Sequence, residues 1–302
     1  MRSKVSVIIP TYNRANLINR AIKSILNQTY QNFEIVAIDD SPDDETEKVV
    51  ESFNDERIKY IRNKAKTNLP RARNQGVRES SSDSKYIAFL DDDDEWLPLF
   101  LEKTVEKLEK EKDSVMVISH AEMRSKSGEF LGEARCDYPH KFWEQSIGSG
   151  CVIRKEIFTK ENFWYDERKV CEDLDFGIRV LKNHKWQCLP EVLRIYYCYP
   201  LLTETSASTA LPVEEIEGFY KKHYLLYSQQ GRKALGFFHF LVGKLFCQSK
   251  EIKRGRIHLL KAFLIYPRPR YLFYCLVSLC FPKLFQSVRF RILKHKIFKG
   301  KL

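Results

Sequence analysis

The sequence lacks an uncharged apolar segment long enough to cross a membrane. An uncharged run at Tyr271–Pro282 has only 12 residues, whereas a transmembrane helix needs about 20 apolar residues. The apolar run Val5–Pro10 near the N-terminus is too short for the hydrophobic region of a secretory signal. The sequence therefore predicts neither a membrane span nor a secretory leader, and Val5–Ile9 is interpreted as a buried strand that Pro10 ends.

Cysteine pairs with the spacing of a metal site are also absent. None of the eight cysteines lies in a Cys-x-x-Cys pair, and their spacing indicates neither a zinc site nor a disulfide framework. We therefore expect free thiols in a reducing cytosol. The eight are Cys136, Cys151, Cys171, Cys188, Cys198, Cys247, Cys275 and Cys280.

Acidic residues are few in the last third of the chain. Of the 302 residues, 43% are hydrophobic, which is enough to bury a sizeable core in one or two domains. Residues 213–302 carry 19 Lys/Arg and 4 Asp/Glu, a net charge of +15, so the net charge of +11 leaves −4 for the rest. Such asymmetry is typical of a region that meets the phosphates of nucleic acid or lipid. A solvated basic face without a partner is the alternative.

Apolar strands and amphipathic helices alternate over the first 120 residues. This order predicts a mostly parallel sheet with helices on both faces. Such sheets bind ligands outside the carboxyl ends of their strands, and three of the expected strands end in Pro10-Thr11-Tyr12, Asp39-Asp40 and Asp91–Asp94. We expect these segments at one rim. The expected strands are residues 5–9, 33–38, 58–61, 86–90 and 115–119.

Four successive aspartates, Asp91–Asp94, follow the fourth expected strand. Like charges this close repel one another unless a cation neutralises them, and Mg²⁺ and Mn²⁺ prefer carboxylate oxygens and bridge to substrate phosphates. Alternate residues of a strand end share a side, so Asp91 and Asp93 are expected to point together and Asp92 away. The alternative is a solvated acidic turn that favours the following helix N-terminus.

Five segments resemble, in order and spacing, the inverting glycosyltransferase family 2, which has the GT-A fold. The match covers about residues 4–200, roughly two thirds of the chain. No single motif decides it, but five in register make a specific pattern. The segments are VSVIIPTYNR (5–14), FEIVAIDDSPDDET (33–46), ARNQG (72–76), YIAFLDDDDEWLP (86–98) and CEDLDFGIR (171–179).

The resemblance implies an architecture for the part of the chain that it covers, and the composition of the remaining residues indicates one for the rest. A Rossmann-like GT-A catalytic domain is expected over residues 1–212, with the nucleotide-sugar half at about 1–120 and the acceptor half at about 121–212. Residues 213–302 are expected to form a basic, apolar helical region. They include ALGFFHFLVGKLF (234–246) and IHLLKAFLI (257–265), each of which can form an apolar helix.

The resemblance also implies a donor site. Pro10, Thr11 and Tyr12 would line the nucleotide pocket, with Tyr12 near the base, and Asp40 would accept a base N–H, which favours uracil. From the residues alone, Tyr12 could be a core aromatic and Asp40 a helix cap. Two further residues, Arg73 and Asn74, match positions beside the ribose and diphosphate.

The outer aspartates of the cluster, Asp91 and Asp93, match the family's Asp-x-Asp motif and would hold Mg²⁺ or Mn²⁺. Asp93 is the better candidate for direct metal contact, while Asp91 could contact metal or ribose. Asp92 occupies the variable position and is counted with the donor-binding residues. Trp96 is expected to pack in the core.

Asp173 matches the family's catalytic base. An acceptor hydroxyl is a poor nucleophile until its proton is removed, and one carboxylate opposite the leaving diphosphate gives inversion in a single displacement. Glu172 and Asp175 are rival carboxylates, but on a helix Asp173 and Asp175 point about 200° apart. The alternative for all three is a set of first-turn acids that complement the helix dipole.

One departure from the family concerns a histidine. Many members carry a histidine after the late strand, near the diphosphate, but here that segment reads RIYYCYP (194–200). Tyr199 could stand in its place. None of the seven histidines is assigned to the site, and His120 is expected to be a packed or capping residue.

The basic C-terminal region predicts peripheral membrane contact. Its leucines and aromatics would enter the headgroup zone, with Lys and Arg against anionic lipid, and RFRILKHKIFKGKL (289–302) would add attraction. The alternative is a helical bundle that only packs on itself and on the catalytic domain. The expected location is the cytoplasmic face of the membrane.

Together these features predict a metal-dependent transferase that moves a sugar from a UDP-linked donor to the hydroxyl of a lipid-linked or envelope glycan. A rival within the class transfers to a polyprenyl phosphate. Other classes are a basic nucleic-acid-binding protein and a nucleotide-binding module without turnover. No nucleic-acid motif is found and no nucleic-acid partner is expected, and the intact carboxylates at 91, 93 and 173 argue against a module without turnover.

Overall fold

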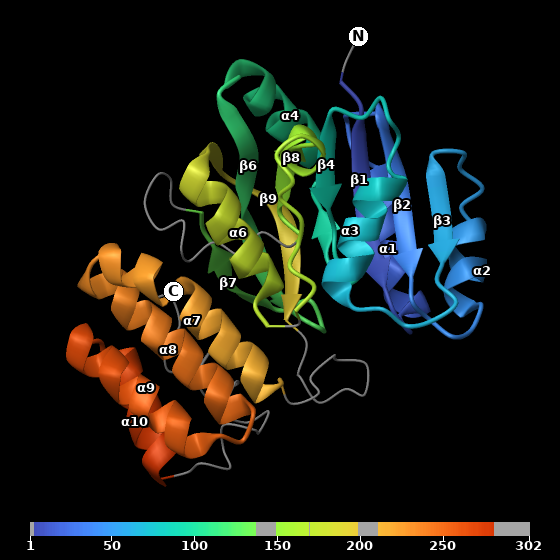
Figure 1. Cartoon of the computed structure of the whole chain (residues 1–302). Coiled ribbons are helices and arrows are strands. Elements are labelled where there is room, and N and C mark those ends of the chain that lie inside the picture. The colour runs from blue at the N-terminus through green and yellow to red at the C-terminus, as the bar shows by residue number, and fades with distance from the viewer. Residues whose placement is uncertain (1–2, 137–148, 169, 199–210, 281–302) are drawn as a thin grey trace. The chain divides into compact units, whose positions relative to one another are not determined.

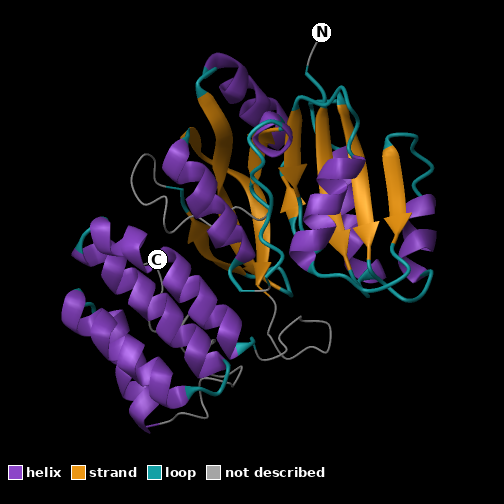
Figure 2. Cartoon of the chain, in the orientation of Figure 1, coloured by secondary structure: helices purple, strands orange, loops and turns teal. Residues whose placement is uncertain are grey.

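The computed structural model describes residues 3–136, 149–168, 170–198 and 211–280 (Figure 1). The chain divides into two compact units. The first, the catalytic unit, comprises Met1–Glu167 and Glu172–Tyr199, and the second, the helical unit, comprises Arg168–Cys171 and Pro200–Leu302. Figure 2 shows that strands occur in the first unit and that the second is built from helices. The boundary predicted between residues 212 and 213 lies further along the chain than the end of the catalytic unit.

The catalytic unit is organised around one sheet with strand order β3-β2-β1-β4-β8-β6-β9-β5, to which β7 is added beside β6. Strands β3, β2, β1 and β4 are parallel, and β9 is parallel to β6, while β8 and β5 run antiparallel to their neighbours. The strands are β1 Val5–Thr11, β2 Phe33–Asp39, β3 Ile58–Arg62, β4 Tyr86–Phe89, β5 Glu95–Trp96, β6 Ser114–Ser125, β7 Phe130–Ala134, β8 Cys151–Arg154 and β9 Lys185–Cys198.

Helices cover both faces of this sheet, as the alternation of strands and helices predicts. Successive residues of β1 enter different cores, because side chains alternate across a strand. Val7 packs in a cluster with α1 and α4, while Ile8 packs in a second cluster with α3 and α6. The helices are α1 Ala15–Leu26, α2 Glu45–Glu51, α3 Leu69–Glu79, α4 Phe100–Lys110, α5 Glu156–Thr159 and α6 Glu172–Asn183.

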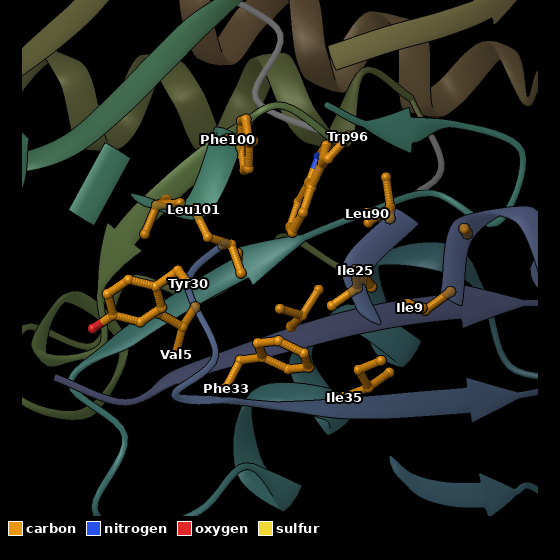
Figure 3. Close-up of a cluster of buried hydrophobic side chains, with 14 of the residues drawn as sticks. Val5, Ile9, Ile25, Tyr30, Phe33, Ile35, Leu90, Trp96, Phe100 and Leu101 are labelled. Carbon is orange, nitrogen blue, oxygen red and sulfur yellow. The ribbon is translucent and has the colours of Figure 1, made fainter. Parts of the chain in front are cut away.

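Figure 3 shows the first of these clusters. Trp96 is 3% exposed and stacks on Phe100 with ring centroids 4.2 Å apart. Its indole Nε1 donates to the Ser149 carbonyl at 3.1 Å. Trp96 is therefore a core residue, as expected, and it anchors the start of α4 beneath the acidic turn at Asp91–Asp94.

Proline at position 10 does not end β1, contrary to the sequence-based expectation, because the strand continues to Thr11. The backbone N–H of Leu90 donates to the Ile8 carbonyl, so the nitrogens of Ile8 and Pro10 face β4. Pairing with β4 ends at Phe89, opposite Ile8. The missing N–H of Pro10 therefore leaves no ladder bond unmade, and β1 can extend its polar end to the rim.

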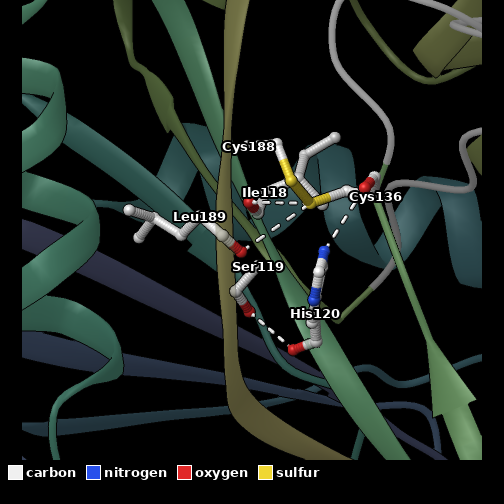
Figure 4. Close-up of a disulfide and its surroundings, with 6 residues drawn as sticks. All are labelled: Ile118, Ser119, His120, Cys136, Cys188 and Leu189. Carbon is white, nitrogen blue, oxygen red and sulfur yellow. Dashed lines mark hydrogen bonds between the residues drawn. A yellow bond between two sulfur atoms is a disulfide. The ribbon is translucent and has the colours of Figure 1, made fainter.

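A disulfide joins Cys136, just after β7, to Cys188 of β9, with their Cα atoms 5.9 Å apart (Figure 4). The expectation of free thiols is wrong for this pair. The two cysteines are 52 residues apart, and they meet because β6 pairs with both β7 and β9, which sequence spacing cannot reveal. His120 packs against the disulfide with Nε2 3.3 Å from the Cys136 carbonyl oxygen, so it is a packing residue as expected.

The helical unit contains α7 Val213–Gln229, α8 Arg232–Gln248, α9 Ile252–Ile265 and α10 Pro269–Cys280. A Cβ on Gly243 of α8 would lie 2.9 Å from the Leu259 nitrogen and 3.0 Å from the Gly255 carbonyl oxygen. Glycines therefore let α8 and α9 cross at close range. No helix in the described part of the chain is long and apolar enough to span a bilayer. Tyr199 and the segment 289–302, both named in the sequence predictions, lie outside the described residues.

Candidate active site

The ends of β1, β2 and β4 are joined through Thr11. Its carbonyl oxygen accepts the backbone N–H of Asp40 at 3.1 Å, and its hydroxyl donates to the Asp92 carboxylate at 2.7 Å. Because these strands are parallel neighbours, their carboxyl ends meet at one edge of the sheet. The structure thus brings the three predicted polar segments to a common rim.

Asp40 lies directly after β2 and is buried. Its Oδ1 accepts the side-chain amide of Asn63 at 2.7 Å, and its Oδ2 accepts the Thr67 backbone N–H at 3.0 Å and hydroxyl at 2.6 Å. The chain between β3 and α3 therefore folds over this carboxylate. Within this loop, Lys66 places its Nζ 3.5 Å from the centroid of the Tyr12 ring, so Tyr12 lies beside a basic group at the same rim.

Asp92 and Asp93 share Arg14. Its Nη1 donates to Asp92 at 2.8 Å and to Asp93 at 2.9 Å. Burial raises the pKa of Asp92 to about 7, and burial together with the Asp91 carboxylate raises the pKa of Asp93. Asp92 is turned inward against Thr11 and Arg14, but the expected pairing of Asp91 with Asp93 on one side is not seen, because β4 ends at Phe89 and Asp93 binds the same Arg14 nitrogen as Asp92. Sequence reasoning did not single out Arg14, although it lies within the matched segment at residues 5–14.

Asp94, which the sequence predictions left without a role, is also buried. Its carboxylate accepts the Ser149 hydroxyl and the Tyr197 backbone N–H, the latter at 3.1 Å. Burial and the neighbouring Asp91 and Asp93 carboxylates raise its pKa well above the ordinary value. Asp94 therefore ties the acidic turn to the second half of the sheet.

Arg73 of α3 is the centre of the site. It is 1% exposed, and its two terminal nitrogens donate to different carboxylates: Nη2 to Asp91 at 2.8 Å and Nη1 to Asp173 at 3.1 Å. Burial alone would lower the pKa of Arg73, but the Asp91 and Asp173 carboxylates raise it well above its usual value. One guanidinium thus joins the end of β4 to the start of α6, segments that lie 82 positions apart in the sequence.

The three carboxylates at the start of α6 have different surroundings. Asp173 keeps a quarter of its side chain exposed while it contacts Arg73. Asp175 is nearly buried and pairs with Arg179 at 2.7 Å, one turn along the helix. Burial and the adjacent Asp173 carboxylate raise the pKa of Glu172. Glu172 also lies 3.5 Å from Arg73 Nη1, but Asp173 is closer, at 3.1 Å, and is the more exposed of the two.

Asn74 supports the chain that leads into α6. Its Nδ2 donates to the Tyr165 carbonyl oxygen and its Oδ1 accepts the Tyr165 backbone N–H, both at 2.9 Å. The side chain is buried, and these bonds use its amide on the interior side. A direct contact between Asn74 and a nucleotide, which the resemblance implies, stays a prediction.

Asp91 and Asp93 have the chemistry of a Mg²⁺ or Mn²⁺ site. Both keep part of their carboxylate exposed, 27% for Asp91 and 18% for Asp93, on either side of the buried Asp92. Such ions are commonly held by one or two carboxylates together with substrate phosphates and water, so two oxygen donors suffice. An ion here would share these carboxylates with Arg73 and Arg14.

Comparison with known proteins agrees with this geometry. Residues 6–158 match the model of Glycosyl transferase family 2. The chain is 33% identical over 185 residues to the Escherichia coli UDP-Glc:alpha-D-GlcNAc-diphosphoundecaprenol beta-1,3-glucosyltransferase WfgD, covering 60% of this chain and 70% of that protein. It is 41% identical over 107 residues to the Campylobacter jejuni GalNAc(5)-diNAcBac-PP-undecaprenol beta-1,3-glucosyltransferase, a third of each chain.

Solved structures share the fold. Residues 1–349 of Staphylococcus aureus TarS, in complex with UDP-GlcNAc, superpose with a TM-score of 0.64 and 18% identity, over 97% of this chain and 89% of that one. The mannosyltransferase PcManGT from Pyrobaculum calidifontis, in complex with GDP-Man and Mn²⁺, gives a TM-score of 0.57 and 14% identity, over 99% and 87%. The sheet with helices on both faces is therefore GT-A-like, as expected. A family model that spans half of the chain, a relative aligned over most of its own length and a shared fold lead to one conclusion: the chain belongs to glycosyltransferase family 2.

Proposed function

We propose that this glycosyltransferase moves a sugar, with inversion, from a UDP-linked donor to a hydroxyl of a lipid-linked glycan. The observation that carries the proposal is the single guanidinium of Arg73 that holds both Asp91 and Asp173. It sets the carboxylate of the donor motif beside the carboxylate that matches the family's base. The names of the Escherichia coli and Campylobacter jejuni relatives, both with undecaprenol-linked acceptors, support the choice of acceptor.

The rim at the ends of β1 and β2 receives the nucleotide. Tyr12 stacks near the base, Asp40 accepts a base N–H, and Pro10 and Thr11 shape the floor of the pocket. Because Asp40 already accepts bonds from Asn63 and Thr67, its carboxylate is fixed in orientation before the donor arrives. Such preorganisation lowers the entropic cost of binding.

The diphosphate lies at the acidic turn. Asp91 and Asp93 hold Mg²⁺ or Mn²⁺, and Asp92 keeps the turn in place through Thr11 and Arg14. The bound ion supplies charge stabilisation to the departing phosphate oxygens. Arg73 and Asn74 support the ribose and diphosphate side of the pocket.

Asp173 removes the proton of the acceptor hydroxyl as its oxygen attacks the anomeric carbon. The pairing with Arg73 holds the Asp173 carboxylate in place, and an ionised carboxylate is the form that a general base needs. The bond from the anomeric carbon to the diphosphate oxygen breaks at the same time, and its electron pair leaves with the nucleoside diphosphate. Attack from the face opposite the leaving group inverts the anomeric centre.

A donor screen tests the first half of this proposal. Thermal unfolding is followed with UDP-, GDP- and dTDP-sugars, each with and without Mn²⁺, because a ligand that binds only the folded state raises the midpoint. We expect UDP-sugars with Mn²⁺ to give the largest rise. A larger response to GDP- or dTDP-sugars would contradict the base assignment, and no response to any nucleotide sugar would contradict the function.

The helical unit supplies a membrane-binding surface, the leucine face. Exposed apolar side chains recur at helical spacing on α9, and again on the packed neighbour α10. On α9, Ile257 and Leu260 lie between the exposed Lys253 and Lys261, and Leu264 follows Lys261. Apolar residues flanked by lysines fit an anionic phospholipid surface. The leucine face comprises Ile257, Leu260, Leu264, Leu272, Leu276 and Leu279, each at least 41% exposed.

Vesicle flotation tests the leucine face. We expect the protein to float with vesicles that contain phosphatidylglycerol, less so at high salt, and the triple variant I257S/L260S/L264S to bind about tenfold or more weakly. Leu99→Ser, which changes an exposed leucine in the catalytic unit, is the control and should float normally. Equal flotation of the triple variant, or binding of RNA in place of vesicles, would contradict the assignment.

A further inference from the structure

Arg194 of β9 forms no ion pair with any residue in the described part of the chain. It is paired in register with Trp96 of β5, and its Nε is buried without a hydrogen-bond partner. Among the described residues, no carboxylate lies within the 4.0 Å ion-pair distance of its guanidinium. Burial lowers the pKa of Arg194. A buried N–H that is left without an acceptor is costly unless a ligand supplies one.

Glycine at position 150 makes room for this guanidinium. A Cβ on Gly150 would lie 2.1 Å from Cζ and 2.2 Å from Nε of Arg194. The backbone there is held in place, because Trp96 donates to the Ser149 carbonyl and the Ser149 hydroxyl donates to Asp94. The space over Gly150, which the guanidinium occupies, is therefore bounded by fixed backbone. Any side chain at position 150 would collide with the guanidinium.

The guanidinium lies near the acidic turn without pairing with it. After burial, the strongest influence on Arg194 is the Asp94 carboxylate, and Asp91 also contributes. Both carboxylate oxygens of Asp94 already accept hydrogen bonds, from Ser149 and Tyr197, and Asp91 already pairs with Arg73. The described residues therefore offer Arg194 no paired anion, and its guanidinium lies near the acidic turn, where the proposed donor brings its diphosphate.

We propose that Arg194 binds the diphosphate of the nucleotide-sugar donor and stabilises the negative charge that develops as it leaves. This inference rests on the proposed function. Arg194 transfers no proton. The acceptor proton goes to Asp173, while the electron pair of the broken sugar–oxygen bond stays on the phosphate oxygen, where the planar guanidinium can hold two oxygens at once.

Calorimetric titration of the full chain with UDP and with pyrophosphate, both in the presence of Mn²⁺, tests the inference. Arg194→Gln should weaken both ligands about ten- to a hundredfold, the range for bonds to a charged group. Gly150→Ala should weaken them as well, because the methyl group displaces the guanidinium while the backbone, which is not left-handed at this residue, tolerates alanine.

Arg154→Lys is the matched control. Arg154 is a buried arginine on β8 whose guanidinium donates to the Ser114 and Leu108 carbonyls. Its substitution shows whether loss of stability alone lowers ligand affinity, because it leaves Arg194 and Gly150 unchanged. Its affinity for UDP should stay near that of the wild type. Unchanged UDP affinity in Arg194→Gln, with a wild type that binds UDP, would overturn the Arg194 assignment alone.

The two probes separate the inference from the proposed function. A wild type that binds pyrophosphate in an Arg194-dependent way but ignores UDP would support Arg194 and contradict the UDP donor. Binding of neither probe would overturn both. A higher KM for the acceptor in Arg194→Gln, with unchanged affinity for UDP, would overturn the donor assignment. The guanidinium would then bind the acceptor.

Discussion

The two units place their charged and apolar side chains in opposite ways. Among the described residues, all seven buried Asp and Arg residues belong to the catalytic unit. By contrast, eight of the twelve exposed large hydrophobic residues belong to the smaller helical unit. Buried charge is costly and persists where it is paired or functional, while exposed apolar area marks contact with another surface. The contrast agrees with the proposal that one unit carries the chemistry and the other the attachment to a membrane.

The largest expected effect is on catalysis in the first unit. Asp173→Asn removes the base but keeps a neutral oxygen for Arg73, so transfer to a hydroxyl acceptor should fall about 10²- to 10⁴-fold. UDP affinity should change little, and vesicle flotation, a property of the other unit, not at all. Steady-state transfer assays beside calorimetry measure the difference. A near-normal rate would favour a phosphate acceptor, which needs little base catalysis.

The buried charges of the catalytic unit should also carry stability. Arg73→Gln leaves Asp91 and Asp173 without their shared cation, and we expect unfolding in urea to show a loss of about 3 kcal/mol. Arg62→Gln provides the control, because the pair of Arg62 with Glu47 is largely exposed and should contribute less than about 1 kcal/mol. Equal losses of unfolding free energy in the two variants would refute a special role for the buried Arg73 and its carboxylates.

Close packing, in place of charge, should determine stability in the helical unit. In Gly243→Ala the new methyl group meets backbone atoms of α9 at about 3 Å, which cannot move as a side chain can, so we expect a loss of about 1–3 kcal/mol. Lys233→Ala, exposed on the same helix, should change stability by less than about 0.5 kcal/mol. Transfer to a water-soluble acceptor should survive in both variants, and its loss would show that the two units are not functionally separate.

The smallest effect concerns pH. His239 and His258 face each other with Nδ1 atoms 3.0 Å apart. Burial lowers the pKa of each to about 4, with added repulsion from Lys261 on both and from His239 on His258. The folded state therefore binds fewer protons than the unfolded chain between pH 6.5 and 4, and stability present above pH 6.5 should be lost as the pH falls through this window.

The loss should reach about 1 kcal/mol or more, since one pKa unit corresponds to about 1.4 kcal/mol. Thermal midpoints at pH 7.5 and pH 5 would measure it, and the double variant H239Q/H258Q should show a smaller difference between the two. If the double variant kept the same difference between the two midpoints, groups other than these histidines would cause the pH dependence of stability.

Much of the catalytic unit could be predicted because its signals are local. Val5–Ile9, Phe33–Ile38 and Tyr86–Leu90 are apolar runs followed by polar residues, and each forms a strand close to the predicted bounds. The short β5 and the irregular β7 were missed. The two residues of β5 exist because they pair with β9, a partner about a hundred positions away.

The site residues also divide into those that local sequence could predict and those that depend on distant contacts. Asp91 and Asp173 could be singled out from their motifs, but nothing local shows that one guanidinium holds both, because that depends on where Arg73 of α3 lies relative to the end of β4 and the start of α6. Cys136 and Cys188 pair for a similar reason, through the strands on either side of them. Arg194 gave no signal, since an arginine in a strand resembles any other until its surroundings are known.

The position of Arg73 between two carboxylates has a consequence for any mutational study of the enzyme. Neutralising Asp91 leaves the whole guanidinium to Asp173 and strengthens its hold on that oxygen, and neutralising Asp173 does the reverse. The free-energy effects of the two substitutions will therefore not add. A thermodynamic cycle over both positions should yield a coupling energy even though the two side chains are proposed to act on different substrates, Asp91 on the donor and Asp173 on the acceptor.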